Sequence, residues 1–356
     1  MTRDLMRIAK EREIVNNTIR SFFCDRGYTE VETPIVVRSP GMEPNLVPFE
    51  TTVVEPDGTK HFAGLITSPE YSMKKLMGLG MEKIFTLTKV FRNVEELGGT
   101  HNPEFTMLEW YQQGADYVEC MNETEALVKV VVTACSPLLQ KERDRVRSSF
   151  GDPFRRTRVR DLFLQHVGLD LDEATTDDLK TSCATHKIHT DPSDTESDLY
   201  YRLFLALCEP HIQGGAGDSE LGARDGKPQA TSYKPQAPLF LYDYPKHQAA
   251  LSRLTKDGKY GERFELYIDG IELCNAFTEL TDADEQRRRF IEEGEERRGL
   301  GKTVFPLDEE LLRLLPNLKN PSYGNALGVD RLHMIATGAK SIEEVMLFPA
   351  GELFRQ

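Results

Sequence analysis

The chain has 356 residues and a formal net charge of −14, which opposes a broad nucleic-acid surface because phosphate binding needs clustered lysine and arginine. A local basic groove is still compatible with this charge. The six cysteines form no C-x-x-C pair, so the sequence predicts neither a zinc site nor a disulfide framework and fits a reducing cytoplasm.

The first half of the chain predicts helices and strands in alternation. A helix over residues 3–26 carries apolar residues at helical spacing and ends at Gly27, unlike a signal peptide. The longest apolar run, near Leu127–Cys135, is too short and too interrupted to span a membrane. The other predicted elements are a strand over Tyr28–Val37 that Pro34 interrupts, a short helix over Pro69–Met77, strands over Lys83–Phe91 and Glu104–Tyr111, and a helix to Cys135 that Asp116 and Glu119 cap.

The second half begins with a charged, mostly helical stretch over residues 141–200. Residues 214–238 are rich in glycine, proline and polar side chains, so we predict a flexible insertion there. The remaining predicted elements are strands over Leu239–Asp243, Arg263–Ile268 and Ile271–Leu280, and helical segments over Asp282–Arg298, Leu307–Leu315, Gly328–Thr337 and Ser341–Leu347.

The most informative segment is the hairpin at 91–111. Arg92 closes its first strand, and a polar loop that contains glycines follows. Because alternate side chains of a strand share a face, Phe105, Glu109 and Tyr111 point to one side of the second strand. A cation, an aromatic ring, a carboxylate and a phenol in this order suit a nucleotide beside a cationic substrate. The alternative is an ordinary hairpin with a solvated loop.

A second hairpin is predicted at Asp269-Gly270, a pair that favours a two-residue turn. This turn makes Glu265 and Glu272 diagonal neighbours on one face, roughly 7–8 Å apart at Cα. Like charges at that distance need a cation between them, and such ligands suit Mg²⁺ that is shared with substrate phosphates. The alternative is a pair of solvated glutamates.

These segments resemble motifs of the class II aminoacyl-tRNA synthetases, and among them the lysyl branch. The hairpin sequence FRNVEELGGTHNPEFTMLEWY resembles motif 2. Further resemblances are GYTEVETP at Gly27–Pro34 to motif 1, TSPEYSMKKL at Thr67–Leu76 to the amino-acid-binding segment, RFELYIDGIELCNAFTEL at Arg263–Leu280 to the metal and substrate strands, and ALGVDRLHMIATGAKSIEEVMLFP at Ala326–Pro349 to motif 3. The resemblance implies one α/β (α+β) catalytic domain over residues 1–356, with a mainly antiparallel sheet flanked by helices.

The resemblance also implies a site for ATP and Mg²⁺. Arg92 would hold the α-phosphate and Phe105 would stack on adenine opposite Arg331, which makes the two arginines the expected catalytic residues. The family commonly has Glu after the Arg-Asn pair, whereas this chain has Val94 and a longer loop, so Glu95 is assigned that role. The implied ATP contacts are Arg92, Asn93, Glu95, His101, Asn102, Phe105, Glu272, Leu273, Gly328 and Arg331, and the implied metal ligands are Glu265 and Glu272.

The implied substrate pocket is acidic. Glu70, Glu109 and Glu279 supply more carboxylates than a neutral amino acid would need, and a buried ammonium requires such partners. The resemblance implies that they contact the amines of lysine. The implied set is Ser68, Pro69, Glu70, Glu109, Tyr111, Asn275, Phe277, Glu279 and Ala326. In a regular strand Asn275, Phe277 and Glu279 would lie on the face opposite to Glu272. A β-bulge would bring both sets to one face, so we predict one near Leu273–Cys274.

In the implied reaction the amino-acid carboxylate attacks the α-phosphorus of ATP and leaves an aminoacyl-adenylate. Motif 1 begins at Gly27 and the chain ends soon after motif 3, so we expect no anticodon-binding domain. In this respect the chain resembles truncated lysyl-synthetase paralogues that transfer (R)-β-lysine, or more weakly α-lysine, to a lysine side chain of translation elongation factor P. Ala326 replaces a glycine that is usual in lysyl-tRNA synthetases, and its methyl group would reshape the pocket floor.

Two alternatives stay open. A minimal lysyl-tRNA synthetase, or another lysine-activating enzyme, would need a basic tRNA surface that the acidic balance opposes. A non-catalytic regulatory paralogue should have lost Arg92, Glu265, Glu272 or Arg331, and all four are present. We expect a cytoplasmic homodimer paired through the motif 1 segment Leu5–Pro34, with ATP and elongation factor P as partners, no membrane and no tRNA.

Overall fold

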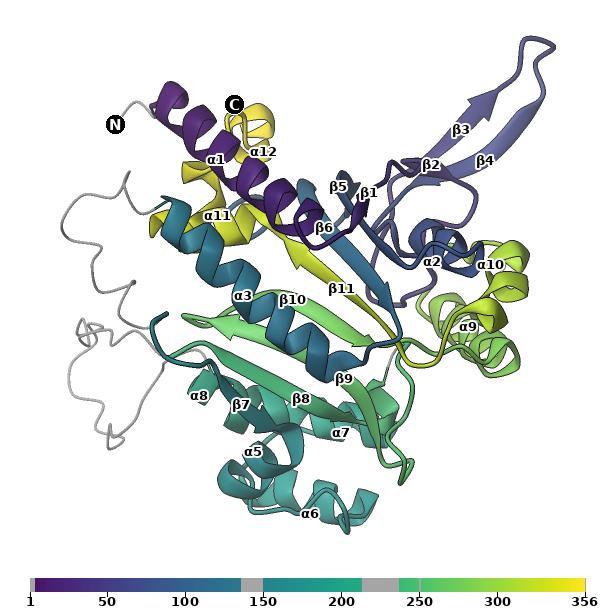
Figure 1. Ribbon diagram of the computed structural model, residues 1–356. Coiled ribbons are helices and arrows are strands. Elements are labelled where there is room, and N and C mark those ends of the chain that lie inside the picture. The colour runs from purple at the N-terminus through teal and green to yellow at the C-terminus, as the bar shows by residue number, and fades with distance from the viewer. Residues whose placement is uncertain (1–3, 136–149, 213–236, 250, 356) are drawn as a thin grey trace. The chain divides into compact units, whose positions relative to one another are not determined.

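The computed structural model describes residues 4–135, 150–212, 237–249 and 251–355 (Figure 1). Of the predicted insertion, all but residues 237 and 238 lies outside this part of the chain. The described residues group into two compact units, Met1–Lys141 with Cys274–Gln356, and Glu142–Leu273. One catalytic domain over the whole chain stays a prediction.

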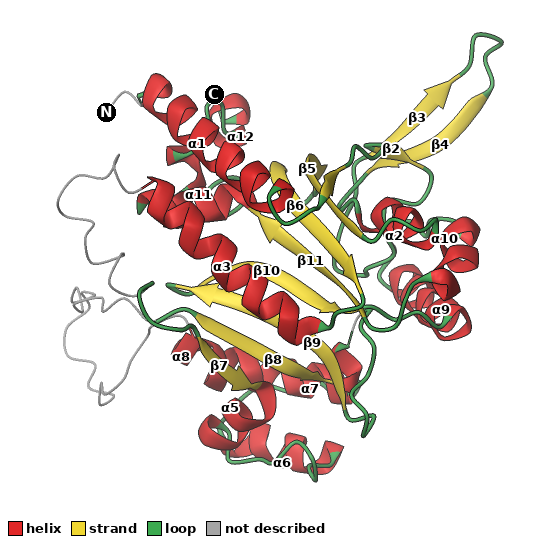
Figure 2. Cartoon of the chain, in the orientation of Figure 1, coloured by secondary structure: helices red, strands yellow, loops and turns green. Residues whose placement is uncertain are grey.

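A mainly antiparallel sheet organises the first unit, as predicted (Figure 2). Its strands follow the order β1-β5-β6-β11-β10, and only the pairing of β1 with β5 is parallel. Their bounds are Thr29–Glu30 for β1, Lys83–Phe91 for β5, Glu104–Gln113 for β6, Ser322–Gly328 for β11 and Ile271–Thr278 for β10, whose residues from Cys274 onward belong to this unit.

Helices cover this sheet. Three of them, α1 (Leu5–Cys24), α3 (Tyr117–Cys135) and α11 (Val329–Thr337), pack against one another, while α2 (Glu70–Gly78) packs on β5 and β6. Trp110 of β6 contacts Phe23 of α1, with ring centroids 5.2 Å apart. The remaining helices of the unit are α9 (Ala283–Gly299), α10 (Glu309–Leu314) with the short turn η5 (Leu315–Asn317), η6 (Ile342–Glu344) and α12 (Ala350–Phe354).

Local signals placed several helix ends correctly. Asp116 accepts a hydrogen bond from the N–H of Val118 (2.8 Å), and Glu119 accepts one from the N–H of Asp116 (3.1 Å). In the helical segment predicted over Ser341–Leu347, Ser341 and Glu344 form a capping box, but it begins only the 3₁₀ turn η6. Short polar side chains at these positions satisfy N–H groups that the first helical turn leaves unpaired.

The strand predicted over Tyr28–Val37, with an interruption at Pro34, is present only as two short strands that belong to different sheets. The chain contributes β1 to the large sheet and β2 (Val36–Val37) to a separate three-stranded sheet, β2-β4-β3. Pro34 lies between the two and cannot donate to a strand ladder. The antiparallel strands β3 (Glu50–Val54) and β4 (Lys60–Leu65) were not predicted.

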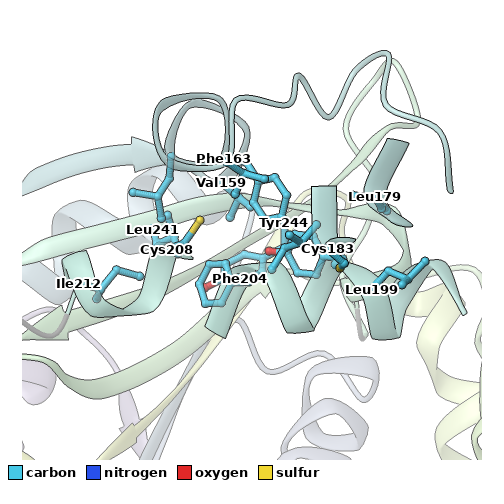
Figure 3. Packing of buried hydrophobic residues seen from close by; sticks show 14 of the residues in the cluster. Val159, Phe163, Leu179, Cys183, Leu199, Phe204, Cys208, Ile212, Leu241 and Tyr244 are labelled. Atoms are coloured by element: carbon cyan, nitrogen blue, oxygen red, sulfur yellow. The ribbon is translucent and has the colours of Figure 1, made fainter. Parts of the chain in front are cut away.

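The second unit has its own strands and core. In it β8 (Leu239–Pro245) pairs antiparallel with β9 (Tyr260–Ile268) and parallel with β7 (Arg155–Arg158). Its helices are α5 (Val159–His166), α6 (Thr176–Thr185), α7 (Glu196–Leu203), the π-helix η3 (Phe204–Cys208), α8 (Glu209–Ile212) and the turn η4 (Lys246–Gln248). Side chains from the helices and β8 form one apolar core (Figure 3).

The predicted Asp269-Gly270 turn is confirmed. Strand β9 ends at Ile268 and β10 begins at Ile271, and both turn residues have positive φ, +50° and +77°. A two-residue turn of this type needs left-handed backbone at both positions, which Asp and Gly tolerate. The pairing of β10 with β11 is regular from Cys274 to Thr278, and the bulge near Leu273–Cys274 stays a prediction.

The structure also bears on cysteine pairing and on membrane spans. All six cysteines are free thiols, and five of them are buried. Among the residues that the structure describes, no helix combines the length and the apolar character that crossing a membrane requires.

Candidate active site

Three neighbouring strands of the first unit align the predicted substrate residues on one face of the sheet. In the register of β6, β11 and β10, two rows of directly opposed residues cross the strands. The rows are Glu109, Ala326 and Asn275, then Tyr111, Gly324 and Phe277. Directly opposed residues share a face, so the sheet brings together side chains that are far apart in the sequence. Trp110 points to the opposite face, as alternation predicted.

Glu109 is a fully buried carboxyl group on this face. Ser68 Oγ donates a hydrogen bond to its Oε1 (2.5 Å), and the Tyr111 hydroxyl donates to its Oε2 (3.0 Å). Burial, and next the charge of Glu70, raise the pKa of Glu109 to about 8. A nearby cation favours the charged form of such a group, so an arriving ammonium would gain a carboxylate partner.

The chain's own Lys74 lies between the two other predicted substrate carboxylates. Its Nζ is 2.6 Å from Glu70 Oε1 and 2.6 Å from Glu279 Oε2, and the Lys74 and Glu279 side chains are only 1% and 0% exposed. The same atom lies 5.1 Å from the centre of the Phe277 ring. Although burial acts to lower it, Glu279 and Glu70 raise the pKa of Lys74, so this side chain is an ammonium.

The predicted nucleotide residues form two contacting pairs. The guanidinium carbon of Arg92 lies 5.3 Å from the centre of the Phe105 ring. Arg331, in the first turn of α11, places Nη2 3.1 Å from His101 Nε2, and its Nε donates to the carbonyl of Thr100 (3.3 Å). Burial and the Arg331 charge lower the pKa of His101, which favours the neutral imidazole that can accept from Arg331.

The side-chain amides of Asn93 and Asn102, in the segment that resembles motif 2, form hydrogen bonds with backbone groups. Asn102 Nδ2 donates to the carbonyl of Glu104 (2.6 Å), and its Oδ1 accepts from the N–H of Ala350 (2.8 Å). Asn93 Oδ1 accepts from the N–H of the next residue, Val94 (2.9 Å). Contact of these two amides with ATP stays a prediction.

The loop after Asn93 has an unusual backbone. Val94 is exposed and has φ +59°, a left-handed conformation that β-branched residues rarely adopt. Glu95 is half-buried. Burial and Arg331 lower the pKa of His101, whereas the charge of Glu95 acts to raise it. Glu95 is therefore an electrostatic neighbour of the His101 ring.

Other predicted residues lie at element boundaries. Pro69 immediately precedes α2, and Gly328 closes β11 and immediately precedes α11. The nearest atoms that a Cβ added at Gly328 would meet belong to the Arg331 side chain, and the first lies at 3.7 Å. A close approach of this backbone to the nucleotide therefore stays a prediction. Leu273 is buried in the part of β10 that belongs to the second unit.

The two predicted metal ligands belong to the second unit. Glu265 is buried and accepts from Arg263 Nη2 (2.5 Å), the Tyr244 hydroxyl (2.5 Å) and the Tyr267 hydroxyl (2.6 Å), whereas Glu272 is exposed. A carboxylate has about four acceptor positions, so Glu265 keeps capacity for a cation. Within the described ranges no three His, Cys, Asp or Glu side chains cluster as metal ligands. The donor set therefore fits Mg²⁺ shared with phosphates, not a cage made of protein alone.

The sequence model of the tRNA synthetases class II (D, K and N) matches residues 1–352. The chain belongs to this family. It is also similar to a protein of Yersinia enterocolitica serotype O:8 / biotype 1B, with 37% identity that covers 96% of this chain and 94% of the relative. A protein of Salmonella typhi is 38% identical over 95% of this chain and 93% of its own length. Both are named elongation factor P--(R)-beta-lysine ligase.

In this class II chain, Gly324 is a site residue that the sequence analysis missed. An added Cβ would overlap the ring of Tyr111 and the Oε1 atom of Glu279. Glycine at this position therefore allows the phenol and the carboxylate to lie directly over β11. The pattern Ser-Tyr-Gly-Asn-Ala-Leu-Gly gave no strand signal, so this constraint became visible only with the strand register.

Asp330 of the motif 3 segment was also missed. Its Oδ1 pairs with Arg12 Nη2 of α1, and its Oδ2 accepts from the N–H of Thr106 (2.6 Å). Asp330 is 1% exposed. One carboxylate thus ties the helix of motif 1 and a strand of motif 2 to the helix that carries Arg331.

Proposed function

We propose that this chain activates (R)-β-lysine, or lysine, with ATP and transfers the acyl group to a lysine side chain of translation elongation factor P. The names of the similar proteins support this proposal. The observation that carries it is a cluster of acidic side chains in the first unit, in which Glu109 is fully buried and the equally buried Glu279 already pairs with Lys74. Buried carboxylates are costly unless a cation pairs with them, and a diamino acid supplies such cations.

The proposed chemistry has two steps, and neither needs a protein nucleophile. A carboxylate oxygen of the amino acid attacks the α-phosphorus, the bond to the bridging oxygen breaks, and pyrophosphate leaves. The neutral amine of the acceptor lysine then attacks the acyl carbon, AMP leaves with the electron pair of the broken bond, and the new amide loses a proton to solvent. Arg92 and Arg331 would hold and neutralise the phosphate charge.

Glu265 and Glu272 would hold Mg²⁺ that arrives with ATP. When bound, the ion neutralises phosphate charge and orients the leaving pyrophosphate. Arg263, Tyr244 and Tyr267 would fix the orientation of Glu265, since all three donate hydrogen bonds to its carboxylate.

Glu272→Gln is expected to lower amino-acid-dependent pyrophosphate exchange by roughly a hundredfold or more while the melting temperature stays unchanged, since Glu272 is exposed and a neutral amide is a poor Mg²⁺ ligand. Binding of Mg²⁺–ATP, measured by calorimetry, should weaken in parallel. Glu295→Gln, which changes an exposed glutamate paired with Arg298, is the control. Full exchange by Glu272→Gln at ordinary Mg²⁺ levels would end the assignment.

Ala326→Gly is expected to raise the activation of α-lysine relative to (R)-β-lysine. Ala326 lies directly between Glu109 and Asn275 in the strand register, where one methyl group alters the floor without altering the charge. A methyl-sized difference allows a change of up to roughly tenfold to a hundredfold. The readout is the ratio of the two kcat/KM values, and equal ratios for the variant and the parent would show that Ala326 does not determine the choice.

Dimer formation through motif 1 stays a prediction. The apolar stripe of α1, which includes Ile8, Val15 and Ile19, is buried within its own unit. A partner would therefore use residues of this segment outside the stripe, such as the exposed Leu5 and Met6. We expect light scattering to give twice the chain mass at micromolar concentration, and a monomer there would contradict the proposal.

The proposed activity is tested by ATP–pyrophosphate exchange with a panel of amino acids. We expect exchange with (R)-β-lysine and weaker exchange with α-lysine, and none with norleucine, which keeps the four-carbon side chain of lysine but lacks its terminal amine. Exchange with norleucine as strong as with lysine would contradict the assignment of the acidic pocket.

A further inference from the structure

We propose that Lys74 is a positioning residue that sets how much positive charge the amino-acid pocket accepts. This inference rests on the proposed function and assigns a role to a residue outside the predicted contact set. Lys74 is the fifth residue of α2, one helical turn after Glu70, and this i,i+4 spacing places the two side chains on one face of the helix.

The ammonium of Lys74 is fixed from two sides. Glu70 comes from its own helix, and Glu279 follows β10, with each carboxylate oxygen 2.6 Å from Nζ. The backbone N–H of Glu279 donates to the carbonyl of Ser322 (2.8 Å), so the sheet holds this carboxylate while the helix holds the ammonium. Phe277 closes the site with its ring 5.1 Å from Nζ.

The charges in the pocket then match a doubly cationic substrate. Glu70, Glu109 and Glu279 are three carboxylates, and Lys74 is one ammonium. When all four groups are ionised, their net charge is two negative units. This charge balances the two positive charges of the ammonium groups of lysine or β-lysine. Glu109, which has Ser68 and Tyr111 as hydrogen-bond partners and no ion pair with Lys74, is the carboxylate left for one substrate ammonium.

Without Lys74 the same pocket would hold three carboxylates in a buried space. Such groups take up protons instead of remaining as unpaired charges. They would then no longer be the ordered acceptors that the substrate amines need. Burial raises the pKa of Glu279 to about 8, and the charge of Lys74 acts against this rise. Lys74 thus holds the carboxylates of Glu70 and Glu279 in fixed positions before the substrate arrives.

The test uses Lys74→Ala, which removes three methylene groups and the ammonium, and n-propylammonium, which matches the missing atoms. In lysine-dependent pyrophosphate exchange we expect the KM for lysine to rise at least about tenfold and the KM for ATP to change less than about twofold. Added propylammonium should recover most of the loss with saturation, whereas 1-propanol, of similar size but neutral, should not. Lys75→Ala is the matched control, because its ammonium pairs with Asp308 and Glu310 instead (2.7 and 3.2 Å).

Several results would overturn the inference. One is an unchanged KM for lysine in Lys74→Ala. Another is recovery by 1-propanol that equals the recovery by propylammonium. A third is a loss of both lysine and ATP binding together with a lowered melting temperature. Lys74→Met, which keeps most of the volume, serves if the alanine variant does not fold, and failure of both to fold would assign Lys74 to stability alone. Absence of exchange in the parent chain would instead refute the proposed function.

Discussion

Gly324→Ala is expected to reduce kcat/KM for lysine by at least about a hundredfold, mainly through loss of substrate binding. The new methyl group would overlap the Tyr111 ring and Glu279 Oε1. Both lie over a strand that is hydrogen-bonded on each side, so the backbone cannot move away easily. Either side chain must shift instead, and misplacement of a positioning group by about 1 Å can cost roughly a hundredfold in rate.

The control for this substitution is Gly299→Ala. Gly299 is the last residue of α9, and a Cβ there meets nothing within 4 Å. We expect this variant to keep the parent's exchange kinetics. An active Gly324→Ala variant with an unchanged KM for lysine would show that Tyr111 and Glu279 are not fixed above β11 as described.

Glu109→Gln is expected to lower kcat/KM for lysine by about two to four powers of ten. Removing one partner of a buried ion pair costs roughly 3–5 kcal/mol, and each tenfold change in rate corresponds to about 1.36 kcal/mol. The loss should appear in the KM for lysine and not in the KM for ATP. Glu104→Gln is the control on the same strand, since Glu104 is exposed and lies 3.5 Å from Lys89 at the surface. A Glu109→Gln variant with the parent's KM for lysine would remove this residue from the site.

The same substitution should change how stability depends on pH. The pKa of Glu109 is raised from 4.5 to about 8 in the folded chain, first by burial. Between these values the native state keeps a proton that the unfolded chain has lost. This contribution is therefore fully present below about 4.5, and it is lost as the pH rises through about 8.

We accordingly expect the substrate-free parent to lose melting temperature between about pH 5 and pH 9, and Glu109→Gln to lose less over the same range. Thermal unfolding of both proteins across this range, without lysine, measures the difference. Parallel curves for the two proteins would indicate that Glu109 is already ionised in the empty pocket.

The strands that carry strong local signals were predictable from the sequence. The hairpin of β5 and β6 has alternating side chains, and its bounds were predicted to within two residues, Lys83–Phe91 and Glu104–Gln113. Asp269-Gly270 specifies its own turn. The sequence analysis missed β3 and the first half of β4, whose side chains are exposed. A strand with no buried face need not alternate apolar and polar residues, so its sequence gives no strand pattern.

The candidate site was predictable in part for a related reason. Residue types and motif spacing indicated Glu109, Tyr111 and Glu279, and the strand register confirmed that their strands are neighbours. Lys74 was missed because a lysine on a short helix is ordinarily solvated, and only the tertiary structure shows that it is buried between two carboxylates. Gly324 was missed because its constraint comes from side chains of two other segments.

The proposal that the acyl acceptor is elongation factor P is tested most directly by mass spectrometry of an incubation mixture. The chain, ATP, Mg²⁺ and (R)-β-lysine would be incubated with elongation factor P and, separately, with lysine tRNA. We predict that the mass of elongation factor P increases by one β-lysyl group on a single lysine, and that the tRNA remains uncharged. An unmodified elongation factor P beside charged tRNA, from a preparation that is active in pyrophosphate exchange, would contradict the proposal.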